Sequence, residues 1–138
     1  MKSFILVFSI LLLSASSSMA ESYNYIAAEQ MKEKLTKGED IIIVDIQVKE
    51  EFEQHHLPGS LATYAYPVKN NCERAALDQA VALYHETGKP VVIVCPRGEG
   101  GAKRGYDFMK SQNVPREQLT ILENGMAGWP YKDLVEGQ

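Results

Sequence analysis

Residues 91–102, Val91-Val92-Ile93-Val94-Cys95-Pro96-Arg97-Gly98-Glu99-Gly100-Gly101-Ala102, join an apolar run to a glycine-rich turn and then to a helical pattern. A short continuous apolar run is typical of a strand buried on both faces of a parallel sheet. Cys95 follows this strand at its carboxyl end, where ligands of such sheets bind. The turn and the helix start gather backbone N–H groups that stabilise anions. A thiol placed there is favoured as its thiolate, which is the reactive form.

Apolar runs and helical patterns alternate along the rest of the chain. Strands are expected at 41–46, 91–95 and 119–122, with a shorter strand at 61–64 and an edge strand at 23–26. Helices are expected at 27–36, 49–54, 73–86 and 101–112, with short helical turns after residue 115 and over 126–132. This alternation predicts an α/β fold with a mostly parallel sheet.

The first twenty residues are typical of a secretory signal peptide. Lys2 supplies positive charge, residues 4–13 are almost entirely apolar, and Ser18-Met19-Ala20 fits a cleavage site. The apolar stretch is shorter than the ~20 residues that a membrane-spanning helix needs. We therefore expect residues 1–20 to be removed and residues 21–138 to form one exported domain. The expected location is the bacterial periplasm, with no membrane attachment after cleavage.

The charge of the chain argues against nucleic acid as a partner. Its formal net charge is −4, and it becomes −5 without residues 1–20, which hold one lysine and no acid. A general nucleic-acid binder would carry a basic stripe. The three histidines lack the spacing and the neighbouring ligands of a metal site, so no metal is expected.

Two cysteines, Cys72 and Cys95, are present. A cysteine pair in an exported protein is by default a disulfide. A domain of this length can form a core without one, and Cys95 lies in a reactive type of turn, so two free thiols are the preferred interpretation. Two roles stay open for Cys72: a bystander on the surface, or a resolving thiol for Cys95.

Three separated segments resemble the rhodanese family of single-domain sulfurtransferases. The first is Val44-Asp45-Ile46-Gln47 with Glu51-Phe52 and His56-Leu57-Pro58-Gly59-Ser60, the second is the Cys95 loop, and the third is Asn124-Gly125-Met126-Ala127-Gly128-Trp129. They follow one another at domain spacing over nearly all of residues 24–132. The resemblance implies a central, mostly parallel five-stranded sheet with helices on both faces.

The resemblance also implies sulfur transfer through a persulfide. In the family, a sulfane sulfur passes from thiosulfate, a polysulfide or a persulfide to the loop cysteine, and then to cyanide or to a small-molecule or protein thiol. Carried over, Cys95 is the nucleophile and no cofactor is needed. The substrate-binding residues implied are those of the loop: Pro96, Arg97, Gly98, Glu99, Gly100 and Gly101.

Several positions depart from the family pattern. Gln47 stands where the family usually has arginine, which changes the local ion pairing. Gly100 stands at the sixth loop position, which is often Arg, Lys or Thr, and Arg97 is the candidate to replace that side chain. Glu99 places negative charge near the thiolate, which disfavours both its formation and the entry of an anion. The three loop glycines predict a roomy pocket that favours polysulfides and organic or protein persulfides over thiosulfate.

Structural roles are expected for several residues near these motifs. Asp45 is expected to accept hydrogen bonds from the backbone of the next turn. His56 is expected to be structural, Tyr64 to lie in the core, and Trp129 to anchor the last turn. Tyr66 fits equally well at the pocket mouth or over the core.

Two other functions stay open. One is a non-catalytic rhodanese-like module that carries sulfur or binds a protein partner. The other is a cysteine phosphatase or arsenate-type enzyme, which needs a loop arginine to grip three oxygens; Gly100 and Gly101 occupy the candidate positions, so this ranks last. Lys103 and Arg104 fit anion attraction and ordinary solvated charge equally well.

Overall fold

The computed structural model describes residues 22–137, and the predicted signal peptide lies outside the described residues. Five strands form one sheet in the order β1-β5-β4-β2-β3. The strands are β1 (Tyr25–Ile26), β2 (Ile42–Asp45), β3 (Leu61–Ala62), β4 (Val91–Val94) and β5 (Leu119–Leu122). All four neighbouring pairs run parallel, so the predicted α/β fold is confirmed, with a sheet that is parallel throughout.

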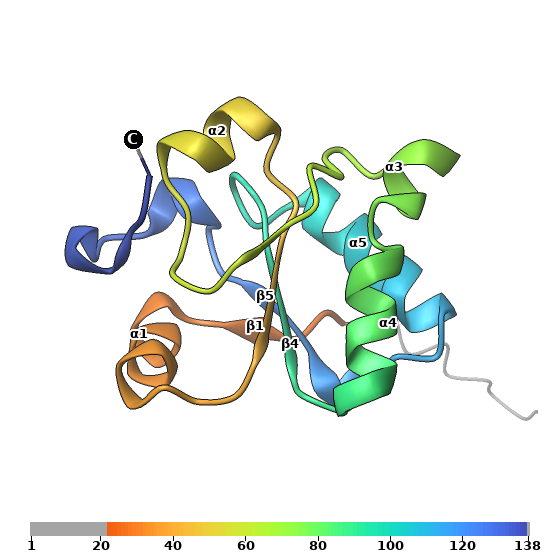
Figure 1. The fold of residues 1–138 in the computed structure, drawn as a ribbon, viewed down its shortest axis with the longest axis horizontal. Coiled ribbons are helices and arrows are strands. Elements are labelled where there is room, and N and C mark those ends of the chain that lie inside the picture. Colours follow the sequence, from red (N-terminus) through yellow and green to blue (C-terminus); the bar gives the residue numbers. More distant parts are fainter. Residues whose placement is uncertain (1–21, 138) are drawn as a thin grey trace, which may run out of the picture.

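The α-helices of this range cover both faces of the sheet. They are α1 (Ala28–Lys37), α2 (Lys49–Gln54), α3 (Asn71–Ala75), α4 (Asp78–Thr87) and α5 (Gly100–Ser111). Helix α1 and the C-terminal segment lie on one side, and α4 and α5 lie on the other (Figure 1). Short 3-10 turns follow at Arg116–Gln118, Met126–Gly128 and Lys132–Leu134. No helix in the described part of the chain is both long and apolar enough to cross a membrane.

Strand β4 is apolar at every position, and β2 and β5 are apolar except at Asp45 and Thr120, because both faces of the sheet are covered. Successive side chains of a strand point to opposite faces. Val44 and Ile93 therefore pack toward α4 and α5, whereas Ile43 and Val92 pack toward α1. Cys95 belongs to the hydrophobic cluster on the α4 and α5 side of the sheet. Its side chain is therefore buried at the residue where the loop begins.

The single helix predicted over 73–86 is two helices. Helix α3 ends at Ala75, and α4 begins at Asp78. Between them, the N–H of Leu77 donates to the carbonyl of Arg74 in a tight i→i−3 turn. Leu77 is fully buried. The break lets this side chain point into the core, and the acidic Asp78 favours a new helix start.

The third strand is shorter than predicted, and the core position expected for Tyr64 is wrong. Strand β3 ends at Ala62, and Tyr64 has a φ of +55° with 43 % of its surface exposed. Its ring packs edge-on against Phe52, with 6.0 Å between the ring centroids. The left-handed backbone at Tyr64 turns the chain out of the strand direction before this side chain could enter the core.

Candidate active site

Cys95 lies at the carboxyl end of β4, the central strand of the sheet. Its Sγ accepts a hydrogen bond from the backbone N–H of Gly98, with 2.7 Å between nitrogen and sulfur. Only 2 % of the residue surface is exposed. The thiol therefore lies at the sheet edge where parallel folds bind ligands, held by its own loop.

Gly98 has a conformation and a position that no other residue could take without strain. Its φ is +75°, and a Cβ placed there would lie 2.8 Å from the backbone nitrogen of Asn124. This conformation aims the Gly98 N–H at Sγ. The loop glycine is thus a structural requirement of the thiol site.

The third of the three segments, residues 124–129, supports the Cys95 loop through backbone contacts. The N–H groups of Met126 and Ala127 donate to the carbonyls of Cys95 and Pro96, both at 2.9 Å. Gly125 has a φ of +58°, and a Cβ on it would overlap the Cys95 carbonyl oxygen. Two segments about 30 residues apart in the sequence therefore fit together backbone to backbone.

The first motif forms a buried polar cluster at the end of β2. Asp45 is fully buried and accepts hydrogen bonds from the backbone and side-chain nitrogens of Gln47, at 2.8 and 3.0 Å. The Gln47 side chain also donates to the His55 carbonyl at 3.1 Å. Burial raises the pKa of Asp45 from 3.8 to about 6, although the Gln47 hydrogen bonds act in the opposite direction. The backbone hydrogen bond predicted for Asp45 is confirmed, and Gln47 supplies donors but no positive charge.

A pocket of about 100 Å³ opens above the thiol. Its lining is Tyr66, Cys95, Pro96, Arg97, Glu99, Gly100, Gly101 and Arg104. Of the loop residues predicted to bind substrate, all except Gly98 line it. Gly98 instead contacts the sulfur and the turn beneath. Arg97 and Glu99 are exposed at the rim.

The roomy pocket predicted from the loop glycines is wrong, because two large side chains fill the space beside Gly100 and Gly101. A Cβ on Gly100 would lie 2.9 Å from Nη1 of Arg104. A Cβ on Gly101 would lie 2.8 Å from two ring carbons of Tyr66. The sequence alone leaves the positions of both side chains open. The i, i+4 spacing of Gly100 and Arg104 is the signal that places them on one face of the helix.

The charges around the pocket favour an anion. Arg97 and Arg104 contribute two guanidinium groups, and Glu99 contributes one carboxylate. The pocket also meets the first turn of α5, where a helix leaves N–H groups without intrahelical acceptors and carries partial positive charge. Lys103, the other cation of this turn, lies elsewhere: its Nζ is 5.6 Å from the centroid of the Tyr23 ring.

Comparison with known sequences decides the family. The profile of the rhodanese-like domain matches residues 27–131. The chain belongs to the rhodanese-like domain family. A separate local match, 38% identical over 58 residues, is to Ephrin-B2a of Danio rerio and spans 42% of this chain but only 18% of that protein.

Solved structures share the fold of this rhodanese-like domain at low sequence identity. The rhodanese-like domain protein from Staphylococcus aureus has a TM-score of 0.62 and 18% identity, covering 83% of this chain and 98% of its own. The BH2092 protein from Bacillus halodurans has a TM-score of 0.63 and 21% identity, and the match covers 83% of this chain and 77% of that one. Yeast Ygr203w, described as a protein tyrosine phosphatase of the rhodanese family, has a TM-score of 0.67 and 11% identity. The match covers 86% of this chain and 95% of that one.

Other polar residues of the rhodanese-like domain have structural partners. The ring of His56 stacks on Phe52 with 4.0 Å between centroids, and its Nδ1 lies 2.8 Å from the Phe52 carbonyl. The indole N–H of Trp129 donates to the Tyr131 carbonyl at 3.0 Å, as expected for an anchor. Cys72 and Cys95 are both free, with Cys72 exposed. Within residues 22–137, no three histidine, cysteine or acidic side chains group as metal ligands.

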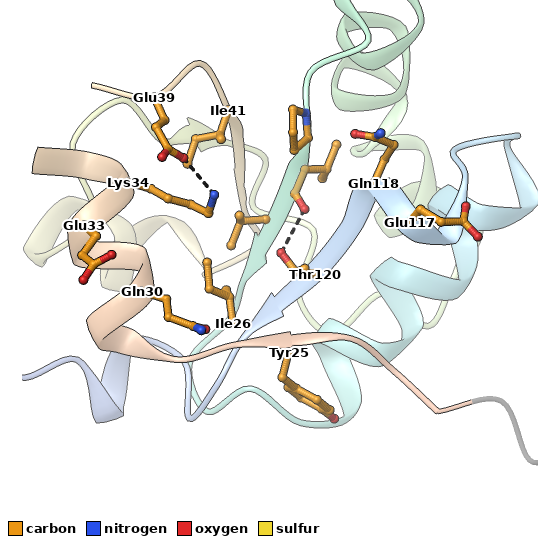
Figure 2. A pocket seen from close by; sticks show the side chains of 13 residues that line it. Tyr25, Ile26, Gln30, Glu33, Lys34, Glu39, Ile41, Glu117, Gln118 and Thr120 are labelled. Carbon is orange, nitrogen blue, oxygen red and sulfur yellow. Dashed lines mark hydrogen bonds and ion pairs between the residues drawn. The ribbon is translucent and has the colours of Figure 1, made fainter. Parts of the chain in front are cut away.

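A larger pocket, of about 470 Å³, lies at the opposite end of the sheet (Figure 2). It borders the amino ends of β2, β4 and β5 and includes the ion pair of Lys34 with Glu39 at 2.8 Å. Its lining has no cysteine or histidine. Of these two pockets, the smaller one above Cys95 is therefore the one that contains a thiol nucleophile.

Proposed function

We propose that this rhodanese-like domain is a sulfurtransferase that carries a sulfane sulfur on Cys95 as a persulfide. The supporting observation is the position of the Cys95 thiol: its Sγ accepts the Gly98 N–H bond at 2.7 Å and faces a small pocket beside a helix start. The pocket volume of about 100 Å³ suits a small sulfur compound. The donors proposed are thiosulfate, polysulfides or persulfides.

In the first half-reaction, the Cys95 thiolate attacks the outer sulfur of the donor. The S–S bond of the donor breaks, and its electron pair leaves with sulfite when the donor is thiosulfate, with a polysulfide shortened by one sulfur when the donor is a polysulfide, or with a thiolate when the donor is a persulfide. The product is a Cys95 persulfide anion. Its charge is then next to the first-turn N–H groups of α5 and the rim guanidinium of Arg97.

In the second half-reaction, an acceptor thiolate or cyanide attacks the terminal sulfur. The bond between that sulfur and Sγ breaks, and Sγ leaves with the electron pair as the Cys95 thiolate. The acceptor departs as a persulfide or as thiocyanate. The transferred sulfur enters and leaves at the same oxidation level, so the cycle needs no oxidant, reductant or cofactor.

The experiment is a mass measurement of the mature protein after incubation with thiosulfate or with polysulfide. One added sulfur atom that cyanide removes, in the wild type and in Cys72→Ser but not in Cys95→Ser, is the expected result. If no donor adds sulfur, the non-catalytic module is favoured instead. Hydrolysis of p-nitrophenyl phosphate that depends on Cys95, without any sulfur adduct, would favour the phosphatase alternative.

We also propose that the domain acts outside the cytoplasm, in the periplasm, after removal of residues 1–20. The support is the sequence pattern of that segment. Expression of the full chain in a bacterium, followed by fractionation and an intact mass, is the test. A periplasmic protein that begins at Glu21 is expected, and a cytoplasmic protein that retains Met1 would contradict the proposal.

A further inference from the structure

We infer that Arg104 determines the specificity of the Cys95 pocket by binding an oxyanion carried by the sulfur donor. The inference rests on the sulfur transfer proposed above. The donor class it favours has a compact charged oxygen group next to the sulfane sulfur, as in thiosulfate and organic thiosulfonates. This reverses the donor preference expected from the loop glycines.

The backbone of the Pro67 segment holds the Arg104 side chain in place. Its Nε donates to the carbonyl oxygen of Pro67 at 2.8 Å. With Nε engaged, the outer nitrogens of the planar guanidinium are directed toward Gly100, and Arg104 is part of the pocket lining. A fork of two N–H donors at a fixed angle matches two oxygens of one anion better than it matches a chain of sulfur atoms.

Gly100 is the residue that admits Arg104. A Cβ at residue 100 would lie 2.9 Å from Nη1 and 3.5 Å from Nη2 of Arg104. Any larger side chain at position 100 would therefore displace the guanidinium. Gly100 and Arg104 thus act as a pair, in which a cation from the next turn of α5 occupies the place of the side chain missing from the loop.

The local charge balance makes Arg104 decisive. Arg97 and Glu99 are the other charged groups lining the pocket, and both are exposed at its rim. Their charges cancel. Removing the Arg104 charge would leave the pocket with no net positive side-chain charge, so its loss should weaken oxyanion binding strongly.

The first test compares two donors in three variants. Arg104→Gln should lower kcat/KM for thiosulfate by about tenfold or more, mainly through KM, and for tetrasulfide by no more than about threefold. Arg104→Lys, which keeps the charge but not the fork, should fall between wild type and Arg104→Gln. Lys103→Gln removes the same charge one residue away and should leave both donors unaffected. Equal losses for the two donors, or no loss for thiosulfate, would overturn the inference.

The second test uses the geometry of the pair. Gly100→Ala should reproduce the thiosulfate defect of Arg104→Gln because the new methyl group displaces the guanidinium. The double variant should lose no more than either single variant, since both changes remove the same interaction. Losses that multiply in the double variant would show that Gly100 acts through the loop and not through Arg104.

The third test does not depend on sulfur transfer. Alkylation of Cys95 by anionic iodoacetate and by neutral iodoacetamide is measured on the separated Cys95 peptide, with the Cys72 peptide as an internal control. Arg104→Gln should reduce the iodoacetate-to-iodoacetamide rate ratio at Cys95 by about threefold or more and leave the ratio at Cys72 unchanged. If the wild type forms no persulfide but shows this change, anion recognition stands and the proposed function fails. If persulfide forms and Arg104→Gln alters neither ratio nor thiosulfate use, the function stands and the inference fails.

Discussion

Replacement of Asp45 by asparagine should change how the stability of the domain depends on pH. Asp45 is fully buried, and burial is the main reason that its pKa rises from 3.8 to about 6. The Gln47 hydrogen bonds and the charge of His56 lower the pKa, and the charge of Glu51 raises it, but these effects are smaller. The rise shows that the buried site penalises the ionised carboxylate.

The sign and the size of this pH effect follow from the difference between the Asp45 pKa values in the folded and unfolded states. Between pH 3.8 and about 6 the unfolded chain has lost the Asp45 proton while the folded protein keeps it. The folded state then binds more protons, so the free energy of unfolding falls as pH rises through this window. A difference of about 2 pH units, at about 1.4 kcal/mol each, gives about 3 kcal/mol of lost stability above pH 6. Asp45→Asn has no proton to lose and should not show this fall.

Urea unfolding of the wild type and of Asp45→Asn at pH 3.5 to 7.5 measures the effect. The difference in unfolding free energy should shift in favour of the variant by about 3 kcal/mol between the two ends. Subtracting the two profiles removes the titration of the other carboxylates. Gln47→Arg supplies the cation usual in the family and should lower the Asp45 pKa, so its stability should not fall in this window.

Parallel pH profiles for wild type and Asp45→Asn would refute this reasoning. They would mean that the Asp45 carboxylate ionises in the folded protein as easily as in the unfolded chain. Gln47 would then compensate fully for the missing arginine. The offset between the profiles is not diagnostic, because asparagine also changes the hydrogen bonds to Gln47.

Three further predictions concern single positions. Gly125→Ala should cost at least about 2 kcal/mol in thermal unfolding, because of its positive φ and the overlap of Cβ with the Cys95 carbonyl; an unchanged Tm would contradict the bracing role of this turn. Asn70→Ala should lower the free energy of unfolding by about 1 kcal/mol, because the Asn70 side chain caps α3 by accepting the Glu73 N–H at 2.8 Å. Equal stability of variant and wild type in urea would show that this cap does not stabilise the domain. Tyr66→Ala should open the pocket, so kcat/KM for a bulky aryl thiosulfonate should rise relative to thiosulfate; an unchanged ratio would mean that the ring does not limit access.

Local pattern was enough to predict the sheet and most helices. The strands around Val44 and Ile93 are apolar because two helical layers cover them, and the glycines after α1 and α4 mark where those helices end. The break before Asp78 was missed because the apolar periodicity continues across it. The left-handed backbone of Tyr64 was missed because tyrosine rarely adopts that conformation.

The thiol and its loop could also be predicted from the sequence, but the fit between the loop and the third motif could not. The contact of Gly125 with the Cys95 carbonyl is backbone against backbone, between segments that are distant along the chain. Each glycine looks locally like an ordinary turn residue. Gly98 and Gly125 are both needed because the two turns approach each other closely. This approach can be recognised only once the turns are placed at the ends of the neighbouring strands β4 and β5.

Gly100 shows why a loop cannot be interpreted one position at a time. In the sequence alone, Gly100 is a position without a side chain. That predicts an empty pocket that binds anions weakly. In the folded helix, residue 104 lies one turn further along the same face, and its guanidinium occupies the space above Gly100. The smaller residue therefore brings a longer and permanently charged side chain toward the thiol pocket. The glycine at the sixth loop position should consequently be interpreted together with the residue four positions later: with arginine there, as in this chain, the pocket gains a second cation beside Arg97, whereas an apolar residue there would leave Arg97 alone.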